Sequence, residues 1–393
     1  MFTLLQWVII GGGIQGLTVA TFLLKKNKTT INQLRIVDPN PKPLENWKRC
    51  TSTISMPYLR SPSVHHLDTE PFSLQSFSKR EHKYKPNTDF YGRYKRPSLQ
   101  MFNDHCDHLI DELKIQQAYV ASRVRNIENC DGYWNVHLQN GEAFKTKKVV
   151  IAIGISDQLH LPDWARNLKQ ANPNSLYHVF DKELPLFEKM SAPFIVVGGG
   201  ITATHLAIKL ASLFPGEVTM LKRHPFRIHD FDSNPEWLGP KMRRPFVQTK
   251  DYTKRRIAIR SARHKGSIPV ELRNRLSQLM RTDKLRIIDG TVIDYNEDRN
   301  RIYLNLDTDE SIDGHTILMA TGFEQNLPGK EWLEPVIKQE KLPCSKCGYP
   351  IVSNMLEWAP NLYVSGALAE LEVGPIARNI SGARVAANII SSN

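Results

Sequence analysis

The chain has 393 residues, 41% of them hydrophobic, and 52 Lys and Arg against 40 Asp and Glu give a formal net charge of +12. This length is too great for one ordinary core and predicts two or three compact units, and no run approaches the about 20 apolar residues of a membrane span. Five cysteines spread through so long a chain do not make a disulfide framework, so a reducing compartment fits them better.

The apolar start of the chain predicts a first strand. Residues 1–13 lack the basic region and the small-residue cleavage site of a signal peptide, and they run directly into a glycine turn. We therefore expect a cytoplasmic protein. After the strand at 5–10 come the turn 11–16, a helical pattern at 17–24 and a strand at 34–37 that ends in an acid. This order is a βαβ unit.

The glycine turn has the spacing of a dinucleotide-binding fingerprint. Gly11 allows a tight turn, Gly13 lets the backbone approach a pyrophosphate, and Gly16 allows close packing of helix on strand. The start of the helix offers free N–H groups and a partial positive charge to the phosphates. Asp38, at the end of the next strand, can accept hydrogen bonds from an adenosine ribose. The alternative is a glycine turn that serves packing alone.

A long excursion rich in Pro, Ser and His follows at 39–97 and predicts irregular structure that carries Leu59-Arg60-Ser61-Pro62. The next elements predicted, in chain order, are a helix at 98–113, strands at 118–124 and 133–138, a hairpin turn at Asn140-Gly141, and a buried strand from Val149 that ends at Gly154.

The same pattern then begins again. A strand at 194–197 leads into Gly198-x-Gly200-x-x-Ala203, a helix at 204–214 and a strand at 218–221. This second strand ends in the cations Lys222-Arg223-His224 instead of an acid. An acid would repel the 2′-phosphate of NADPH, whereas a guanidinium can hold it, so the second turn predicts an NADPH site with Arg223 on the phosphate. Simple solvation of these cations is the alternative.

The repeat predicts an α/β protein with two doubly wound Rossmann-type domains. Residues 316–322 repeat the strand-then-glycine ending of 151–154, and a strand at 362–366 needs a sheet to join. We therefore expect the NADP-binding domain to be inserted into the FAD-binding domain. The predicted parts are 1–157 for the first part of the FAD domain, 190–316 for the NADP domain and 317–393 for the C-terminal part of the FAD domain.

Much of the positive charge lies in residues 241–265. One interpretation is a patch for nucleic acid or a membrane surface. No nucleic-acid fold signature accompanies the run and its aromatic residues are few, so a solvated basic surface is favoured and no nucleic-acid partner is expected.

Two nucleotide sites in one chain, the first acidic and the second basic, indicate FAD and NADPH, because a flavin accepts the hydride of a nicotinamide. With Ala320-Thr321-Gly322-Phe323, Leu59–Pro62 and the closing stretch 366–379, the chain resembles the flavin-dependent monooxygenases with paired Rossmann domains, nearest the lysine/ornithine N-monooxygenase-like branch. The turns and the resemblance together predict these cofactor-binding residues: Gly11, Gly13, Gly16, Asp38, Arg60, Val124, Gly154, Gly198, Gly200, Ala203, Arg223, Thr321, Gly322, Gly366 and Gly374.

The resemblance implies oxygenation of a small, amine-bearing substrate. In that family NADPH reduces the flavin and O₂ then adds at the flavin C4a position, while the protein excludes water. A helix opening at Gly374-Pro375 would point its N-terminus at the flavin. The Baeyer–Villiger fingerprint FxGxxxHxxxW is absent, and Gly366-Ala367 stands where disulfide reductases carry Gly-Asp. No catalytic side chain and no metal site are predicted.

Two other functions stay open. Cys344-x-x-Cys347 could exchange electrons with a flavin, which would make the chain an NADPH-dependent reductase of a disulfide or a quinone. The pair lies in a loop outside both glycine turns, which favours structural cysteines instead. The third possibility is a sensor that binds FAD and NADP without turnover.

Overall fold

A mostly parallel sheet surrounds the N-terminal strand in the computed structural model, which describes residues 4–81, 83–299 and 301–392. Its strands follow the order β19 (Glu357–Ala359), β20 (Leu362–Val364), β8 (Ala143–Ile151), β1 (Leu5–Ile10), β2 (Leu34–Asp38) and β5 (Tyr119–Ala121). β6 (Val124–Cys130) and β7 (Tyr133–Leu138) pair antiparallel, and β7 pairs antiparallel with β8 across the predicted hairpin turn at Asn140-Gly141. The apolar run of β1 is buried because parallel neighbours, β2 and β8, lie on both of its sides.

Helices cover this first sheet. α1 (Ile14–Lys25) packs along α13 (Ile380–Ile390). A Cβ built on Gly382 of α13 would lie 2.1 Å from the Ile376 carbonyl oxygen, so a glycine is required where the turn before α13 folds back on the helix. The other helices of this part of the chain are α2 (Glu45–Thr53), α3 (Ser73–Arg80), α4 (Pro86–Asp89), α5 (Leu99–Glu112), α11 (Lys330–Gln339) and α12 (Glu370–Val373).

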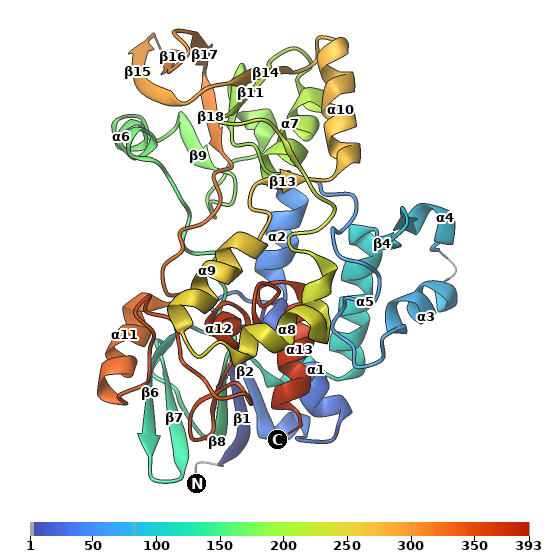
Figure 1. Ribbon diagram of the computed structural model, residues 1–393, viewed down its shortest axis with the longest axis vertical. Helices are drawn as coiled ribbons and strands as arrows, with labels where there is room; N and C mark the ends of the chain where they lie inside the picture. The colour runs from blue at the N-terminus through green and yellow to red at the C-terminus, as the bar shows by residue number, and fades with distance from the viewer. Residues whose placement is uncertain (1–3, 82, 300, 393) are drawn as a thin grey trace.

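A second, fully parallel sheet forms the other domain, stacked end to end with the first (Figure 1). Its order is β14 (Arg286–Asp289), β11 (Val218–Lys222), β10 (Phe194–Val197), β18 (Thr316–Met319) and β9 (Leu176–His178). Around it lie α6 (Asp163–Ala171), α7 (Ile201–Leu213), α10 (Val270–Arg281) and the antiparallel strands β15 (Val292–Asp298), β16 (Arg301–Leu306) and β17 (Ser311–Gly314). Two largely parallel sheets of the Rossmann type in one chain confirm the predicted fold class.

The sheet pairing corrects the predicted domain boundaries. β18 pairs with β10 and β9, so the predicted boundary between residues 316 and 317 cuts a strand of the second sheet. β9 and α6 also belong to that domain, which begins well before residue 190. β20 pairs with β8, and this confirms that the chain returns to the first sheet after the insertion.

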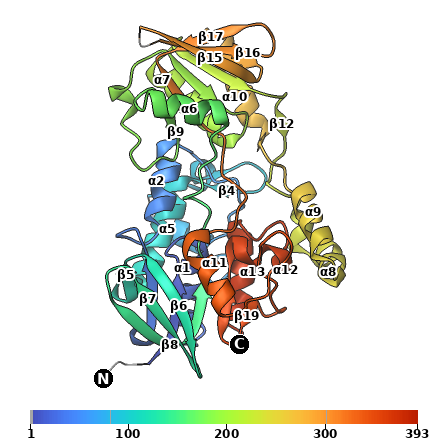
Figure 2. The ribbon, with the colours of Figure 1, turned by 90° about the vertical axis from the view of Figure 1, so that its left-hand side faces the viewer.

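Two excursions cross between the domains in opposite directions. The first, at 39–97, was predicted to be irregular, but it folds into α2, α3, α4 and the short hairpin β3 (Phe90–Tyr91) and β4 (Arg96–Pro97). The second leaves the NADP-type domain between β12 (Arg227–Ile228) and β13 (Ser267–Ile268). Its helices α8 (Pro240–Gln248) and α9 (Tyr252–Ala262) lie against the C-terminal part of the first domain (Figures 1 and 2).

Buried ion pairs hold the second excursion in place. Most cations of 241–265 are exposed, as a solvated basic surface predicts, but two arginines depart from that prediction. Arg255 and Arg256 of α9 are only 6% and 8% exposed. Arg255 pairs with Glu372, and Arg256 pairs with Glu370, which also binds Arg378. The sequence could not show these carboxylates as partners, because they lie more than 100 residues away along the chain.

The Glu370 carboxylate, 1% exposed, depends on its two arginines. Burial alone would raise the pKa of Glu370, but Arg378 and Arg256 outweigh the burial and keep that pKa below its ordinary value. Glu370, Arg256 and Arg378 together form what we call the Glu370 cluster.

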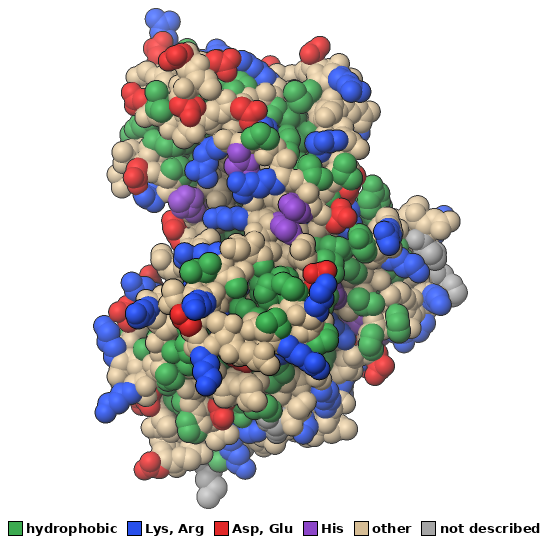
Figure 3. Space-filling view, viewed as in Figure 1, with side chains coloured by type: hydrophobic (Ala, Val, Ile, Leu, Met, Phe, Trp, Pro, Cys, Tyr) green, Lys and Arg blue, Asp and Glu red, His purple; other side chains and the backbone are tan. Residues whose placement is uncertain are grey.

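The surface that Figure 3 shows has histidine and basic side chains gathered at the waist between the two domains. Across residues 4–81, 83–299 and 301–392, no helix has both the length and the apolar character that crossing a membrane requires.

We expect Glu370→Gln to lower the free energy of unfolding by about 3–5 kcal/mol, because it leaves two buried guanidinium groups without their anion. Chemical denaturation followed by circular dichroism measures this. Glu236→Gln is the matched control, since Glu236 faces Lys241 across 3.8 Å at an exposed site, where a pair contributes at most about 1 kcal/mol. Equal losses for the two variants would contradict the stabilising role of the Glu370 cluster.

Candidate dinucleotide sites

The first glycine turn has the three features that a pyrophosphate site requires. Gly11 has φ +117°, and a Cβ there would lie 2.6 Å from the Ala152 carbonyl oxygen. A Cβ on Gly16 would lie 1.8 Å from the Gly11 oxygen, so only glycine lets α1 approach β1 this closely. A Cβ on Gly13 would meet no atom within 4 Å. The turn therefore has no room for a side chain at Gly11 or Gly16, but it has open space at Gly13, the predicted phosphate position.

The start of α1 faces this open position. Gly13 is the N-cap, and no side chain caps the helix. The first N–H groups of an α-helix have no partner within the helix, so an uncapped start is suited to an anion. The residues present therefore fit the pyrophosphate of a dinucleotide.

Gln15 ties the turn to the end of the chain, a contact that the sequence analysis missed. Its Oε1 accepts a hydrogen bond from the Ser365 hydroxyl at 2.8 Å, and its Nε2 donates to the Ala377 carbonyl at 3.0 Å. Predicted site residue Gly366 lies beside the same side chain, where its Cβ would be 3.0 Å from Gln15 Cγ. No signal in the sequence identifies Gln15, because its partners are more than 340 residues away.

Asp38 lies beside the turn, as predicted. Its carboxylate accepts the N–H of Gly12 at 2.7 Å and the N–H of Asn40 at 2.8 Å. The Asn40 side-chain amide also donates to it at 2.7 Å. A carboxylate has about four lone-pair sites, so acceptor capacity for a ribose hydroxyl remains. The Ser122 N–H donates to the Asp38 carbonyl at 2.9 Å, and this contact brings the start of β6 at Val124 to the same edge of the sheet.

Gly154 follows the end of β8 at the carboxyl edge of the first sheet, next to the strand that carries the glycine turn. Gly374 does not open a helix: α13 begins at Ile380, six residues later, so the predicted helix N-terminus at Gly374-Pro375 is wrong. A Cβ on Gly374 would instead meet the rings of Phe246 and Trp237 at 3.5 and 3.7 Å. With its positive φ of +89°, Gly374 forms part of the turn against which the second excursion packs.

Arg60, predicted to bind a cofactor, makes its hydrogen bonds across the contact between the domains. All three of its guanidinium nitrogens are hydrogen-bonded to the second domain, at 2.6–3.0 Å. The structure therefore places Arg60 in the contact between the two domains. Its acceptors are the carbonyls of His229, Asp230 and Phe231, the Asp232 carboxylate and the Ser267 hydroxyl.

The second glycine turn repeats the geometry of the first with one difference. Gly198 has φ +146°, and its Cβ would lie 2.6 Å from the Ala320 oxygen. Ala203 is fully buried, and α7 begins at an uncapped Gly200. Gly200 is less open than Gly13, since its Cβ would lie 3.3 Å from Gly266 Cα. The loop that carries Gly266 therefore forms a wall of the second site.

Among the described residues, Arg223 makes no ion pair or hydrogen bond through its side chain at the second site. Lys222, only 5% exposed, forms an ion pair with Asp289 at the end of β14. The Arg223 side chain is exposed, just beyond the carboxyl end of β11. This is where the adenosine ribose lies in a Rossmann-type site, so Arg223 is placed to meet a 2′-phosphate.

Thr321 and Gly322 lie where the two linkers between the domains cross. They follow β18 of the second sheet, and the Gly322 carbonyl accepts the His160 N–H at 3.0 Å and contacts His178 Nε2 at 3.1 Å. Burial is the main reason why the pKa of His178 is lowered to about 4, so this ring is neutral near pH 7. Thr321 and Gly322 were predicted to lie in the first domain, but the structure places them in the connection between the two domains.

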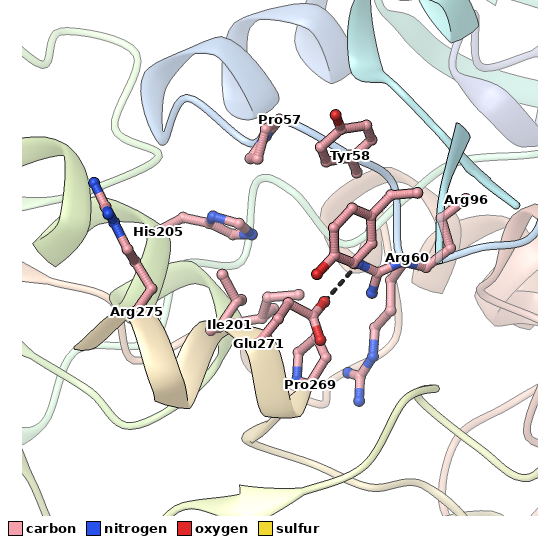
Figure 4. A pocket seen from close by; sticks show the side chains of 11 residues that line it. Pro57, Tyr58, Arg60, Arg96, Ile201, His205, Pro269, Glu271 and Arg275 are labelled. Atoms are coloured by element: carbon pink, nitrogen blue, oxygen red, sulfur yellow. Dashed lines mark hydrogen bonds and ion pairs between the residues drawn. The ribbon is translucent and has the colours of Figure 1, made fainter. Parts of the chain in front are cut away.

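A cavity of about 180 Å³ lies between the domains, beside the first turns of α7 and α10 (Figure 4). Tyr58 and Tyr91 of the first excursion form one wall. His205 of α7 points into it, is 6% exposed and has no hydrogen-bond partner in the described part of the chain. Burial and the nearby Arg96 lower the pKa of His205 to about 4, so the cavity is lined by a neutral imidazole.

Residues 8–156 match the model of a protein family described as FAD-NAD(P)-binding, and no curated protein matches the chain. Among solved structures, the chain is similar to an ornithine hydroxylase from Pseudomonas aeruginosa, with 17% identity, 99% of this chain and 98% of that chain covered, and a TM-score of 0.78.

Two more solved structures are similar. One is the FAD-bound cadaverine monooxygenase of the desferrioxamine biosynthetic pathway from Erwinia amylovora, with 14% identity, 99% and 94% coverage and a TM-score of 0.77. The other is an L-lysine 6-monooxygenase from Pseudomonas syringae, with 16% identity, 98% coverage of each chain and a TM-score of 0.71. At these identities the similarity establishes the shared two-domain fold.

Gly13→Ala and Gly16→Ala should separate the two functions of the first turn. We expect Gly13→Ala to fold with wild-type stability and to lose FAD, because the new methyl group enters only the predicted phosphate position. Gly16→Ala should lose more than about 3 kcal/mol of stability even without FAD, because the methyl group meets the backbone. Denaturation curves and the FAD content of each purified variant measure both effects. Full FAD retention in Gly13→Ala would contradict the assignment.

Proposed function

We propose that this protein is an FAD- and NADPH-dependent monooxygenase that hydroxylates the nitrogen of a small amine, with O₂ as co-substrate. The observation that carries the proposal is the pair of complete dinucleotide turns, one beside Asp38 and the other beside Arg223. An acid at the first ribose and a free guanidinium at the second suit FAD and NADPH, in that order.

Bound FAD would accept a hydride from NADPH and, once reduced, would react with O₂. The chain's own contribution is positioning. The uncapped starts of α1 and α7 would receive the two pyrophosphates, and Arg223 would hold the 2′-phosphate. Arginines from both excursions fix the angle between the domains: Arg60 reaches the second domain, and Arg255 and Arg256 reach the first.

The proteins of similar fold suggest the substrate class. Their names give ornithine, lysine and cadaverine, all of which carry a primary amine at the end of a flexible carbon chain. We therefore include this chemistry in the proposal: a primary alkyl amine, bound as the neutral nucleophile at the moment of oxygen transfer.

The chain's cysteines argue against the alternative of a flavin-linked disulfide reductase. Within the described residues, the side-chain contacts of Cys347 are with Arg256 and Ser345, which belong to neither glycine turn. A flavin that reduces a disulfide needs that disulfide next to its ring. Cys344→Ser/Cys347→Ser should therefore keep the NADPH oxidation rate of the wild type.

The decisive test of the proposed function is amine-dependent oxygen transfer. A panel of ornithine, lysine, cadaverine and shorter diamines is incubated with enzyme, FAD, NADPH and isotopically labelled O₂. We expect at least one amine to accelerate NADPH oxidation and to gain one labelled oxygen atom on nitrogen, measured by mass spectrometry. NADPH oxidation that no amine stimulates, together with loss of that activity in the double cysteine variant, would support the reductase instead.

Cofactor selectivity gives a second test. Arg223→Ala should weaken NADPH binding by about 1.5–3 kcal/mol, roughly a ten- to hundredfold increase in Kd, because charge-assisted hydrogen bonds to the 2′-phosphate are lost. NADH binding should be unchanged. The control is Lys284→Ala. Lys284 is an exposed cation that precedes β14, so it lies at the amino ends of the parallel strands, away from the carboxyl ends where Arg223 lies. Equal losses for both nucleotides in Arg223→Ala would show that Arg223 does not contact the 2′-phosphate.

A further inference from the structure

A cysteine pair next to the Glu370 cluster is not used by the proposed function. Cys344 and Cys347 lie in the loop between α11 and β19, and both are free thiols. Two hydrogen bonds tighten this loop into a turn, from Ser345 N–H to the Tyr349 carbonyl at 2.9 Å and from Gly348 N–H to the Ser345 carbonyl at 2.8 Å. Cys347 is exposed to solvent, whereas Cys344 is half-buried.

Arg256 joins this loop to the Glu370 cluster. Its Nε–H donates to Cys347 Sγ at 3.3 Å, its Nη1 donates to Glu370, and its guanidinium lies 4.0 Å above the Tyr349 ring. The side chain is fixed by these contacts on three sides. Ser345 Oγ lies 3.0 Å from the same sulfur atom.

One donor of Arg256 has no partner. Nη2 is buried, and no acceptor lies within hydrogen-bond distance of it among the described residues. In a planar guanidinium, Nε–H and one Nη2–H share one edge and point the same way, which is the edge that binds two acceptors side by side. Since Nε–H already points at Cys347 Sγ, the unpartnered donor faces the position next to this sulfur. An oxygen atom bonded to Sγ would meet it.

We infer that Cys347 is a site of oxidation by hydrogen peroxide, and that Cys344 then closes a disulfide with it. The thiolate of Cys347 attacks one peroxide oxygen: an S–O bond forms, the O–O bond breaks, and the leaving hydroxide is protonated to water. The Cys344 thiol then attacks the oxidised sulfur: an S–S bond forms, the S–O bond breaks, and a second water leaves. Two thiols and one peroxide thus give one disulfide and two waters.

The electrostatics agree with this geometry. Partial burial opposes ionisation of Cys347, but hydrogen bonds from Ser345, the Tyr349 backbone and Arg256 outweigh it and lower the pKa of the thiol. Burial raises the pKa of Cys344, Cys50 and Cys106. Since the thiolate is the nucleophile, Cys347 is the preferred target among these cysteines, and Cys344 is suited to the later step.

The oxidation has a structural consequence. A disulfide takes Cys347 Sγ out of its contact with Arg256, the residue that also binds Glu370. The redox state of this loop is thereby coupled to the contact between the second excursion and the C-terminal segment. The inference does not rest on the proposed monooxygenase activity, because any source of hydrogen peroxide supplies the oxidant.

The test treats the full-length protein with hydrogen peroxide in the presence of dimedone, which traps sulfenic acids, and maps the modified peptides. Cys50 and Cys130, both half-buried, are internal controls. We expect the Cys347 adduct in Cys344→Ser to form at least about tenfold faster than adducts at either control. Without dimedone, the wild type should form a Cys344–Cys347 disulfide that a dithiol reverses. Labelling of Cys50 or Cys130 as fast as Cys347 would overturn the inference, as would the absence of that disulfide.

Two variants test the environment of the sulfur. Arg256→Lys keeps a cation near Glu370 but removes the two-donor edge, and Ser345→Ala removes one hydroxyl from an exposed loop. Each should slow dimedone labelling of Cys347 by about threefold or more and should raise the pH at which iodoacetamide alkylation reaches half its maximal rate. Unchanged rates and an unchanged alkylation profile in the folded Ser345→Ala variant would overturn the role given to these donors. This arm stands even if Arg256→Lys fails to fold.

Discussion

The Glu370 carboxylate binds two arginines that come from different parts of the chain. Arg256 comes from the excursion of the second domain, and Arg378 comes from the turn before α13. At 1% exposure, burial alone would raise the pKa of this carboxylate, and the two cations keep that pKa below its ordinary value. It therefore joins the second excursion to the C-terminal segment, and Gln15 joins that segment to the first glycine turn. The position of the second domain relative to the first dinucleotide site depends on this chain of contacts.

In the proposed function, nucleotides bound by two separate sheets exchange one hydride, and the reciprocal excursions set the position of one sheet relative to the other. Each domain sends a basic arm across the waist: Arg60 hydrogen-bonds to the loop at 229–232, and Arg255 hydrogen-bonds to Glu372. Hydride transfer between two bound nucleotides requires a fixed separation of their reacting rings. Arginine suits such contacts because one planar group donates several hydrogen bonds in fixed directions.

The parts of the molecule that depend on neighbouring residues could be predicted from the sequence. Both glycine turns, their strands and the return of the chain at β20 were predicted, because the reason for each lies within a few residues or in the repeat itself. The boundary near residue 316 was wrong because the strand-then-glycine pattern at 316–322 resembles the one at 151–154. It was therefore assigned to the first domain, although β18 pairs within the second sheet. The helix predicted to open at Gly374 was wrong, and the contacts of Arg60 with the second domain were not predicted, because both depend on how the domains pack. For the same reason, no pattern identified Gln15 or the burial of Arg255 and Arg256.

The central claim is that the two turns hold FAD and NADPH within reach of one another. Anaerobic mixing of the FAD-loaded protein with NADPH in a stopped-flow spectrophotometer tests it most directly. The account predicts loss of the oxidised-flavin absorbance in a phase whose rate saturates with NADPH, and a much slower phase with NADH at equal concentration. A flavin that stays oxidised under saturating NADPH would contradict the account.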